Sequence, residues 1–174
     1  MNYNELSKAA HENALKHGWW EKRLSNEHCL MLVITEVAEA VEADRERRKA
    51  DTKAFDRMEN KQIAFERYIK NTKEDELADI AIRLFDLAGA LGLDFGKMNP
   101  CRYHRAFDHF TFTDNAFALC KGLGRDIIAV EKRILFGLDY VYGWAKALKV
   151  DLPFFIREKM RYNVMRPYKH GKVY

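Results

Sequence analysis

The sequence has few helix-breaking residues and lacks the short motifs of several common enzyme classes. Its 174 residues include three prolines and nine glycines, too few for the turns of an all-β protein, so helix is favoured. The cysteines, Cys29, Cys101 and Cys120, are widely spaced without a CxxC pair, so neither a disulfide framework nor a zinc site is expected. HExxH, GxxxxGK, GxSxG and Glu-x-x-His are all absent, which argues against zinc metalloproteases, P-loop enzymes, nucleophile-elbow hydrolases and ferritin-type di-iron sites.

Long apolar runs are also missing. The longest aliphatic stretch, residues 30–34, is far below the roughly 20 residues that cross a bilayer, and the first residues have no apolar signal core. We therefore expect a cytoplasmic protein with no membrane partner. The length and the 48% apolar fraction fit one globular domain over residues 1–174.

The net charge of +4 is concentrated at the C-terminal end. Residues 153–174 contain one acid, Glu158, and six bases, so the rest of the chain is nearly neutral. The bases are Arg157, Lys159, Arg161, Arg166, Lys169 and Lys172. The basic character therefore belongs to a short C-terminal segment and not to the whole chain.

Helical periodicity dominates the chain and predicts an all-α helical bundle. We expect helices over about 4–16, 26–48, 73–91, 114–149 with a break near 122–124, and 153–164. The expected caps are Asn4, Ser25, Asn71 or Thr72, and Thr113 or Asp114. Residues 51–71 are predicted to be mobile or partly helical, and residues 93–113 to be irregular.

Two of these helices carry paired acids among apolar residues. Glu36 and Glu39 are three residues apart, and Glu76 and Asp79 repeat the spacing, so each pair leaves one helix face. Four carboxylates in one bundle interior would be unfavourable by several kcal/mol per ion unless a cation neutralised them. Oxygen ligands favour Mg²⁺, or Mn²⁺, over zinc. The alternative is a pair of solvated acidic faces.

The basic C-terminal segment offers groups that bind phosphate. Lys159 and Asn163 are four residues apart and share a helix face, and Arg166 follows just past the helix end. Lysine and arginine bind phosphate oxygens, and an asparagine amide both donates and accepts hydrogen bonds. The alternatives are a solvated cationic tail or, because tyrosines lie among the charges, a nucleic-acid contact. Trp20 can likewise be a core residue or a surface on which a nucleobase stacks.

These motifs together resemble the MazG-like nucleotide pyrophosphohydrolases of the all-α NTP pyrophosphatase superfamily. The resemblance lies in His11-Glu-Asn-Ala14, Gly18-Trp-Trp20, Thr35-Glu36-Val-Ala-Glu39-Ala40, Glu76-Leu-Ala-Asp79-Ile80 and the ending Lys159-Met-Arg-Tyr-Asn163-Val-Met-Arg166-Pro-Tyr-Lys-His-Gly-Lys172. It implies a helical bundle of that type, assembled as a homodimer or homotetramer. The implied reaction is Mg²⁺-dependent hydrolysis of a nucleoside triphosphate, a deoxyribonucleotide or a non-standard one, to the monophosphate and pyrophosphate.

The resemblance also implies roles for single residues. Glu36, Glu39, Glu76 and Asp79 would be metal ligands; Lys159, Asn163 and Arg166 would contact the nucleotide, supported by Tyr168 and Lys169; and Trp20 would lie near the base. Either Glu36 or Glu39 would act in catalysis by orienting the attacking water. Many members have a further glutamate where this chain has Thr35, which leaves the number of metal ions open.

Three questions stay open at the level of the sequence. Residues 97–150 exceed the shorter members of the family and could extend the bundle, form an oligomer interface or cover the site. A non-catalytic nucleic-acid-binding protein using the basic segment is an alternative function, although inward-facing carboxylates do not suit a polyanion partner. A nucleotide sensor without turnover is the other alternative.

Overall fold

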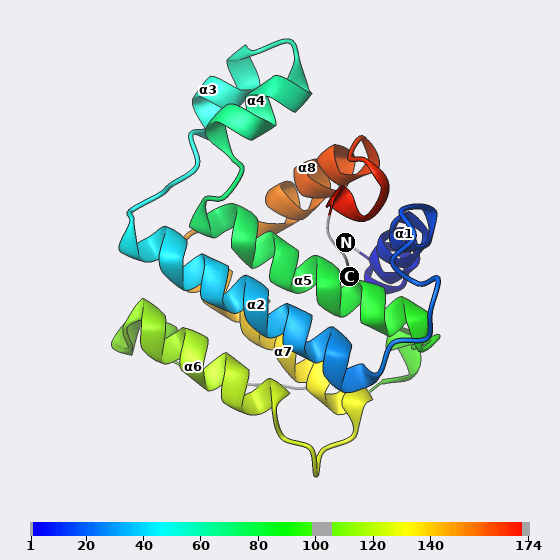
Figure 1. The fold of residues 1–174 in the computed structure, drawn as a ribbon. Coiled ribbons are helices and arrows are strands. Elements are labelled where there is room, and N and C mark those ends of the chain that lie inside the picture. The colour runs from blue at the N-terminus through cyan, green and yellow to red at the C-terminus, as the bar shows by residue number, and fades with distance from the viewer. Residues whose placement is uncertain (1, 99–105, 172–174) are drawn as a thin grey trace.

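The computed structural model describes residues 2–98 and 106–171, and every regular element among them is helical (Figure 1). The α-helices are α1 (Tyr3–Lys16), α2 (Asn26–Arg45), α3 (Thr52–Arg57), α4 (Lys61–Tyr68), α5 (Lys73–Ala90), α6 (Phe112–Leu123), α7 (Val130–Ala147) and α8 (Leu152–Val164). Short 3-10 turns cover Phe95–Lys97, Phe107–His109 and Tyr168–Gly171. The predicted all-α class is confirmed. Cys101 and Lys172 lie outside the described residues.

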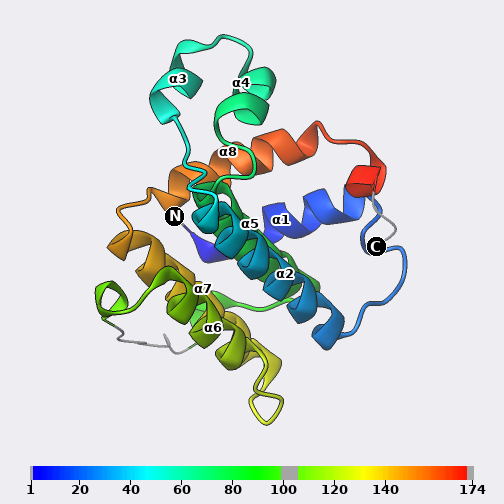
Figure 2. The ribbon, with the colours of Figure 1, turned by 60° about the vertical axis from the view of Figure 1, so that its left-hand side comes forward.

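Helices α2 and α5 form an antiparallel pair at the centre of the bundle (Figures 1 and 2). Helices α6 and α7 pack along one side of this pair, α1 and α8 pack on the other, and α3 and α4 project as a small hairpin. The described part of residues 97–150 therefore extends the bundle against α2 and α5. None of the described helices has the length and apolar character needed to span a membrane.

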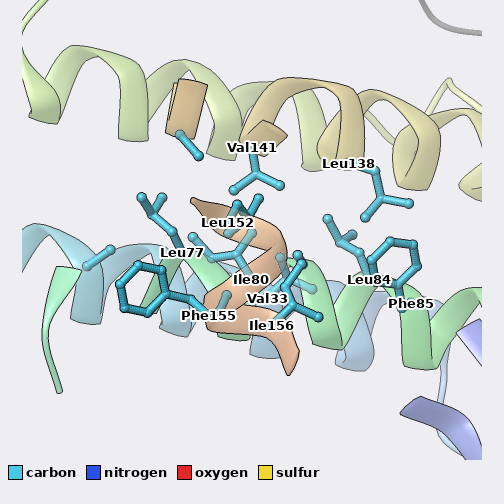
Figure 3. Close-up of a cluster of buried hydrophobic side chains, with 14 of the residues drawn as sticks. Val33, Leu77, Ile80, Leu84, Phe85, Leu138, Val141, Leu152, Phe155 and Ile156 are labelled. Atoms are coloured by element: carbon cyan, nitrogen blue, oxygen red, sulfur yellow. The ribbon is translucent and has the colours of Figure 1, made fainter. Parts of the chain in front are cut away.

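The core is built around α5, whose apolar positions are closed off from solvent. Leu77, Ile80 and Leu84 are fully buried. Figure 3 shows these side chains packed with others from α2, α7 and α8, among them Val33, Leu138, Val141, Leu152, Phe155 and Ile156. Burying one such side chain contributes about 1.5–3 kcal/mol. The opposite face of α5 carries charged residues, and these contact side chains from α1, α2 and α8.

Two predicted helix starts are confirmed. The Ser25 hydroxyl accepts a hydrogen bond from the His28 amide at 3.1 Å and begins α2. The Thr72 hydroxyl accepts from the Asp75 amide at 3.4 Å and begins α5. Helix α2 ends at Arg45, before the predicted end, because two residues later the backbone turns to a positive φ.

Two other caps differ from the prediction. Asn2, not Asn4, caps α1, and its side chain accepts from the Asn4 amide at 2.9 Å. Thr111, not Thr113 or Asp114, caps α6. Asp114 instead occupies the third helical position, and its carboxylate accepts from the Thr111 amide at 3.1 Å, which completes a capping box.

Residues 51–71 are partly helical, as predicted, and form α3 and α4. Phe55 and Phe65 bury the inner face of this hairpin. The Phe65 ring stacks on Tyr162 of α8 with centroids 4.6 Å apart. The hairpin is therefore attached to the helix that carries the basic C-terminal residues.

Substitution of Gly89 tests the close packing of α1 on α5. A Cβ at Gly89 would lie 2.6 Å from the His11 Cβ and 2.7 Å from the Ser7 carbonyl oxygen, so Gly89→Ala must push α1 away. We expect the free energy of unfolding in urea to fall by about 1–3 kcal/mol. Gly124→Ala is the control, because that added Cβ would meet only the carbonyl of Cys120 at 3.3 Å. Equal losses in both variants would contradict this packing.

Candidate active site

A cleft of about 510 Å³ opens beside the α2 and α5 pair. Because the two helices are antiparallel, the middle of α2 lies beside the middle of α5, where Glu36 meets Arg83, and the start of α2 lies beside the end of α5. The first region is charged and includes Glu36, Glu39, Glu76, Asp79, Arg83, Lys159, Asn163 and Arg166. The second is largely apolar and aromatic and includes Ala10, Ala14, Trp19, Trp20, Cys29, Leu32 and Leu87. The cleft thus offers an ionic half and an aromatic half.

Three predicted carboxylates converge in the ionic half. One oxygen from each of Glu36, Glu76 and Asp79 lies within 4.8 Å of the other two, and we call these three residues the carboxylate cluster. Glu36 and Glu76 are only 4% and 3% exposed. Glu39 lines the cleft but is exposed and outside the cluster. A step of three residues turns an α-helix by about 300°, so Glu39 points about 60° away from Glu36, in agreement with its greater exposure.

Basic residues pair with two members of the carboxylate cluster. Lys159 of α8 lies between Asp79 and Asp75, with Nζ 2.6 Å and 2.9 Å from their carboxylate oxygens. Arg83 donates from Nε to Glu36 Oε1 at 2.5 Å. These ion pairs tie α8 to α5 and α5 to α2 through buried charges.

Asp75 and Arg83 are site residues that the sequence analysis missed. Asp75 is completely buried, and its second oxygen, Oδ1, has no hydrogen-bond partner within the described chain. Both residues belong to a series in which Asp75, Asp79 and Arg83 follow one another at intervals of four on α5. That spacing places all three on one helix face. It is the feature of the sequence from which Asp75 and Arg83 could have been predicted as neighbours of Asp79.

Glu76 is the member of the carboxylate cluster without a partner. In the described residues its carboxylate makes no hydrogen bond and no ion pair. Burial, followed by the charge of Asp79, raises the pKa of Glu76 to about 9. An unpaired carboxylate in this position is strongly disfavoured unless a cation or a proton neutralises it.

Burial and nearby charges also act in opposite directions on the pKa values of the neighbouring groups. Burial and the nearby Asp79 raise the pKa of Glu36 to about 6, against the opposing effect of Arg83. Burial likewise raises the pKa of Asp75 to about 6 although Lys159 opposes the shift. Burial lowers the pKa of Lys159, but Asp79 and Asp75 outweigh it, so the pKa is raised overall.

The donor set fits a hard divalent cation. All three members of the carboxylate cluster offer oxygen, and oxygen ligands suit Mg²⁺ and Mn²⁺. The three oxygens lie within 4.8 Å of one another, so these residues are close enough to hold one cation together. Glu76 adds a buried carboxylate that has no ion-pair partner within residues 2–98 and 106–171.

The predicted C-terminal residues divide into those that line the cleft and one that supports it. Asn163, Arg166 and Lys169 line the cleft, and the buried Asn163 Oδ1 has no partner. Tyr168 is absent from the lining. Its ring instead lies so close to Gly18 that a Cβ there would be 2.1 Å from it, which fastens the last 3-10 turn to the loop after α1.

Trp20 lines the aromatic half of the cleft, and its indole nitrogen is engaged in a hydrogen bond. Nε1 donates to Asp86 Oδ1 at 2.9 Å, and the same oxygen is 2.8 Å from His11 Nδ1. The His11 and Trp20 rings meet edge to face with centroids 5.2 Å apart. These contacts hold the indole ring in place at the apolar end of the cleft.

Lys159→Met tests whether Lys159 supports the fold as well as the cleft. Removing the ammonium leaves the fully buried Asp75 without its counter-charge, so we expect a loss of about 3–5 kcal/mol in the free energy of unfolding. Lys73→Met is the matched control, because the Lys73–Asp44 pair at 2.9 Å is more exposed and should contribute less than about 1 kcal/mol. The double variant Asp75→Asn, Lys159→Met should recover part of the loss. Urea unfolding curves that show no difference between the two single variants would contradict the pairing.

Comparisons with known proteins identify no relative of this chain. No protein-family model, no curated protein and no solved structure matches it. The resemblance to MazG-like enzymes therefore stays a prediction, and support for a function comes from the side chains that meet in the cleft.

Proposed function

We propose that the protein is a Mg²⁺-dependent nucleoside triphosphate pyrophosphohydrolase with a helical fold of the all-α NTP pyrophosphatase type. The observation that carries the proposal is one cleft in which the carboxylate cluster lies beside the predicted phosphate-binding residues Lys159, Asn163 and Arg166. A triphosphate is a polyanion that needs both a divalent cation and basic side chains. The aromatic half next to them has the character of a surface for a nucleobase.

The carboxylate cluster would hold the cation. When bound there, a divalent cation supplies positive charge that polarises the phosphoryl group undergoing attack. Arg166 and Lys169 line the same cleft and would neutralise the negative charge that grows on the departing pyrophosphate. The oxygen of water forms a bond to the α-phosphorus, the bond from this phosphorus to the bridging oxygen breaks, and its electron pair leaves with pyrophosphate.

Glu39 is the better candidate for orienting the attacking water. Glu36 is already engaged by Arg83, whereas the Glu39 carboxylate has no hydrogen-bond or ion-pair partner in the described part of the chain. Glu39 also faces the open cleft, where water can reach it. An unengaged carboxylate can accept a proton from the water as the new bond forms. The role of Glu39 as a metal ligand stays a prediction.

The location of the basic residues disfavours the nucleic-acid alternative. Binding to a polynucleotide backbone draws on cations that are displayed to solvent along its path. Lys159 is instead buried in ion pairs, and Arg166 and Lys169 line the cleft. The third possibility, a sensor without turnover, shares the same cleft and differs only in the outcome of an assay.

The first test is product analysis. We expect the protein with Mg²⁺ to release pyrophosphate, not orthophosphate, from at least one member of a panel of ribo- and deoxyribonucleoside triphosphates. Asp79→Asn should lower this rate by about 100-fold or more, since it removes one member of the carboxylate cluster, whereas Asp126→Asn, in an exposed loop outside the cleft, should leave it unchanged. Binding without turnover in both Mg²⁺ and Mn²⁺ would leave the sensor, and the absence of both binding and turnover would contradict the proposal.

The second test separates Glu39 from its neighbours on α2. Glu39→Gln should lower kcat by about 10²–10⁴ because the amide cannot take a proton, with little change in KM. Glu42→Gln is the matched control, since Glu42 is exposed, bonds to Arg45 at 2.6 Å and lies outside the cleft lining. Steady-state kinetics and Mn²⁺ titrations of both variants provide the measurement. A parallel loss of Mn²⁺ affinity in Glu39→Gln would make Glu39 a ligand instead.

A further inference from the structure

Arg83 occupies an unusual position for a base in a proposed metal centre. Its Nε contacts Glu36 Oε1, and Glu36 belongs to the carboxylate cluster. Arg83 follows Asp79 by one helical turn on α5, so it lies on the same face as the second acid of the cluster. A guanidinium stays charged at any pH at which proteins fold. A fixed positive charge is therefore built into the edge of the site.

The charges in this region balance with one divalent cation. When ionised, the carboxylate cluster and the buried Asp75 carry four negative charges. Lys159 and Arg83 provide two positive charges in direct contact with these acids. Two negative charges then remain, and Glu76, which is nine-tenths buried or more and has no partner in the described chain, contributes one of them. Since residual charge in a buried site is unfavourable, one divalent cation completes the balance.

The geometry agrees with this count. The three ligand oxygens lie within 4.8 Å of one another, so a single cation can contact all of them. Paired metal ions in phosphoryl-transfer sites are about 3.5–4 Å apart and share bridging carboxylates. A second ion near Glu36 would meet the Arg83 guanidinium, which already holds one oxygen of that carboxylate. Like charges at such distances repel strongly in a region with little water.

From these contacts we infer that Arg83 acts as a built-in counter-cation that restricts the carboxylate cluster to one divalent ion. This inference rests on the proposed function, because it assumes that the cluster binds a metal. The inference concerns the number of bound ions. The guanidinium of Arg83 would occupy the position next to Glu36 that a second ion would otherwise take.

Counting bound Mn²⁺ tests the inference without any measurement of activity. Electron paramagnetic resonance of free Mn²⁺ during titration of the protein should show one ion bound per chain. In Arg83→Gln a second ion should bind, or the first should bind at least tenfold more tightly, because the competing charge is gone. Arg125→Gln, an exposed arginine outside the cleft, is the control and should match the unmodified protein.

Each outcome decides a separate claim. Two ions bound to the unmodified protein would overturn the inference and leave the proposed function standing, as would unchanged stoichiometry and affinity in Arg83→Gln. Should Arg83→Gln fail to fold, Arg83→Lys keeps a charge but shortens the reach to Glu36, and the count on the unmodified protein still decides the main point. No Mn²⁺ bound to the unmodified protein would contradict the metal-dependent function itself.

Discussion

The site depends on a group of like charges buried between two central helices. The carboxylates of Glu36, Glu76 and Asp79 approach one another where water is scarce, and each ion that loses hydration there is unfavourable by several kcal/mol. The chain offsets part of this with Lys159 and Arg83. Glu76 is left without a partner among the described residues, and this unpaired buried carboxylate is the main reason that we propose a cation in the cleft.

Helix α5 connects the stability of the fold to the chemistry of the cleft. One face carries Leu77, Ile80 and Leu84, which are fully buried in the core. The opposite face carries the series of charges from Asp75 to Arg83. Because α2 and α8 pack on this charged face, any change in the core that shifts α5 also shifts the acids relative to the bases. The helical packing therefore sets the relative positions of the carboxylates.

The sequence predicted the helices and most of the site because both follow from local spacing. Residues three apart on a helix lie near one face, so the spacing predicted that Glu76 and Asp79 leave α5 together. Their convergence with Glu36 of α2 was predicted from the apolar residues around both acid pairs and is confirmed. Residues three apart still differ in direction by about 60°, and Glu39 is exposed and outside the carboxylate cluster. The pairing of Arg83 with Glu36 joins two helices, so it depends on the packing of α2 against α5, which periodicity within one helix does not contain. The predicted cap of α6 was wrong for a local reason, since Thr111 and Asp114 form a capping box that begins the helix two residues before Thr113.

A crystal structure with Mn²⁺ and a nucleoside triphosphate analogue that has nitrogen between the α- and β-phosphorus tests the central claim most directly. We expect one anomalous-scattering peak among the carboxylates of Glu36, Glu76 and Asp79, with the phosphates against Arg166 and Lys169 and the base in the aromatic half of the cleft. A peak elsewhere, or a nucleotide bound outside the cleft, would contradict it.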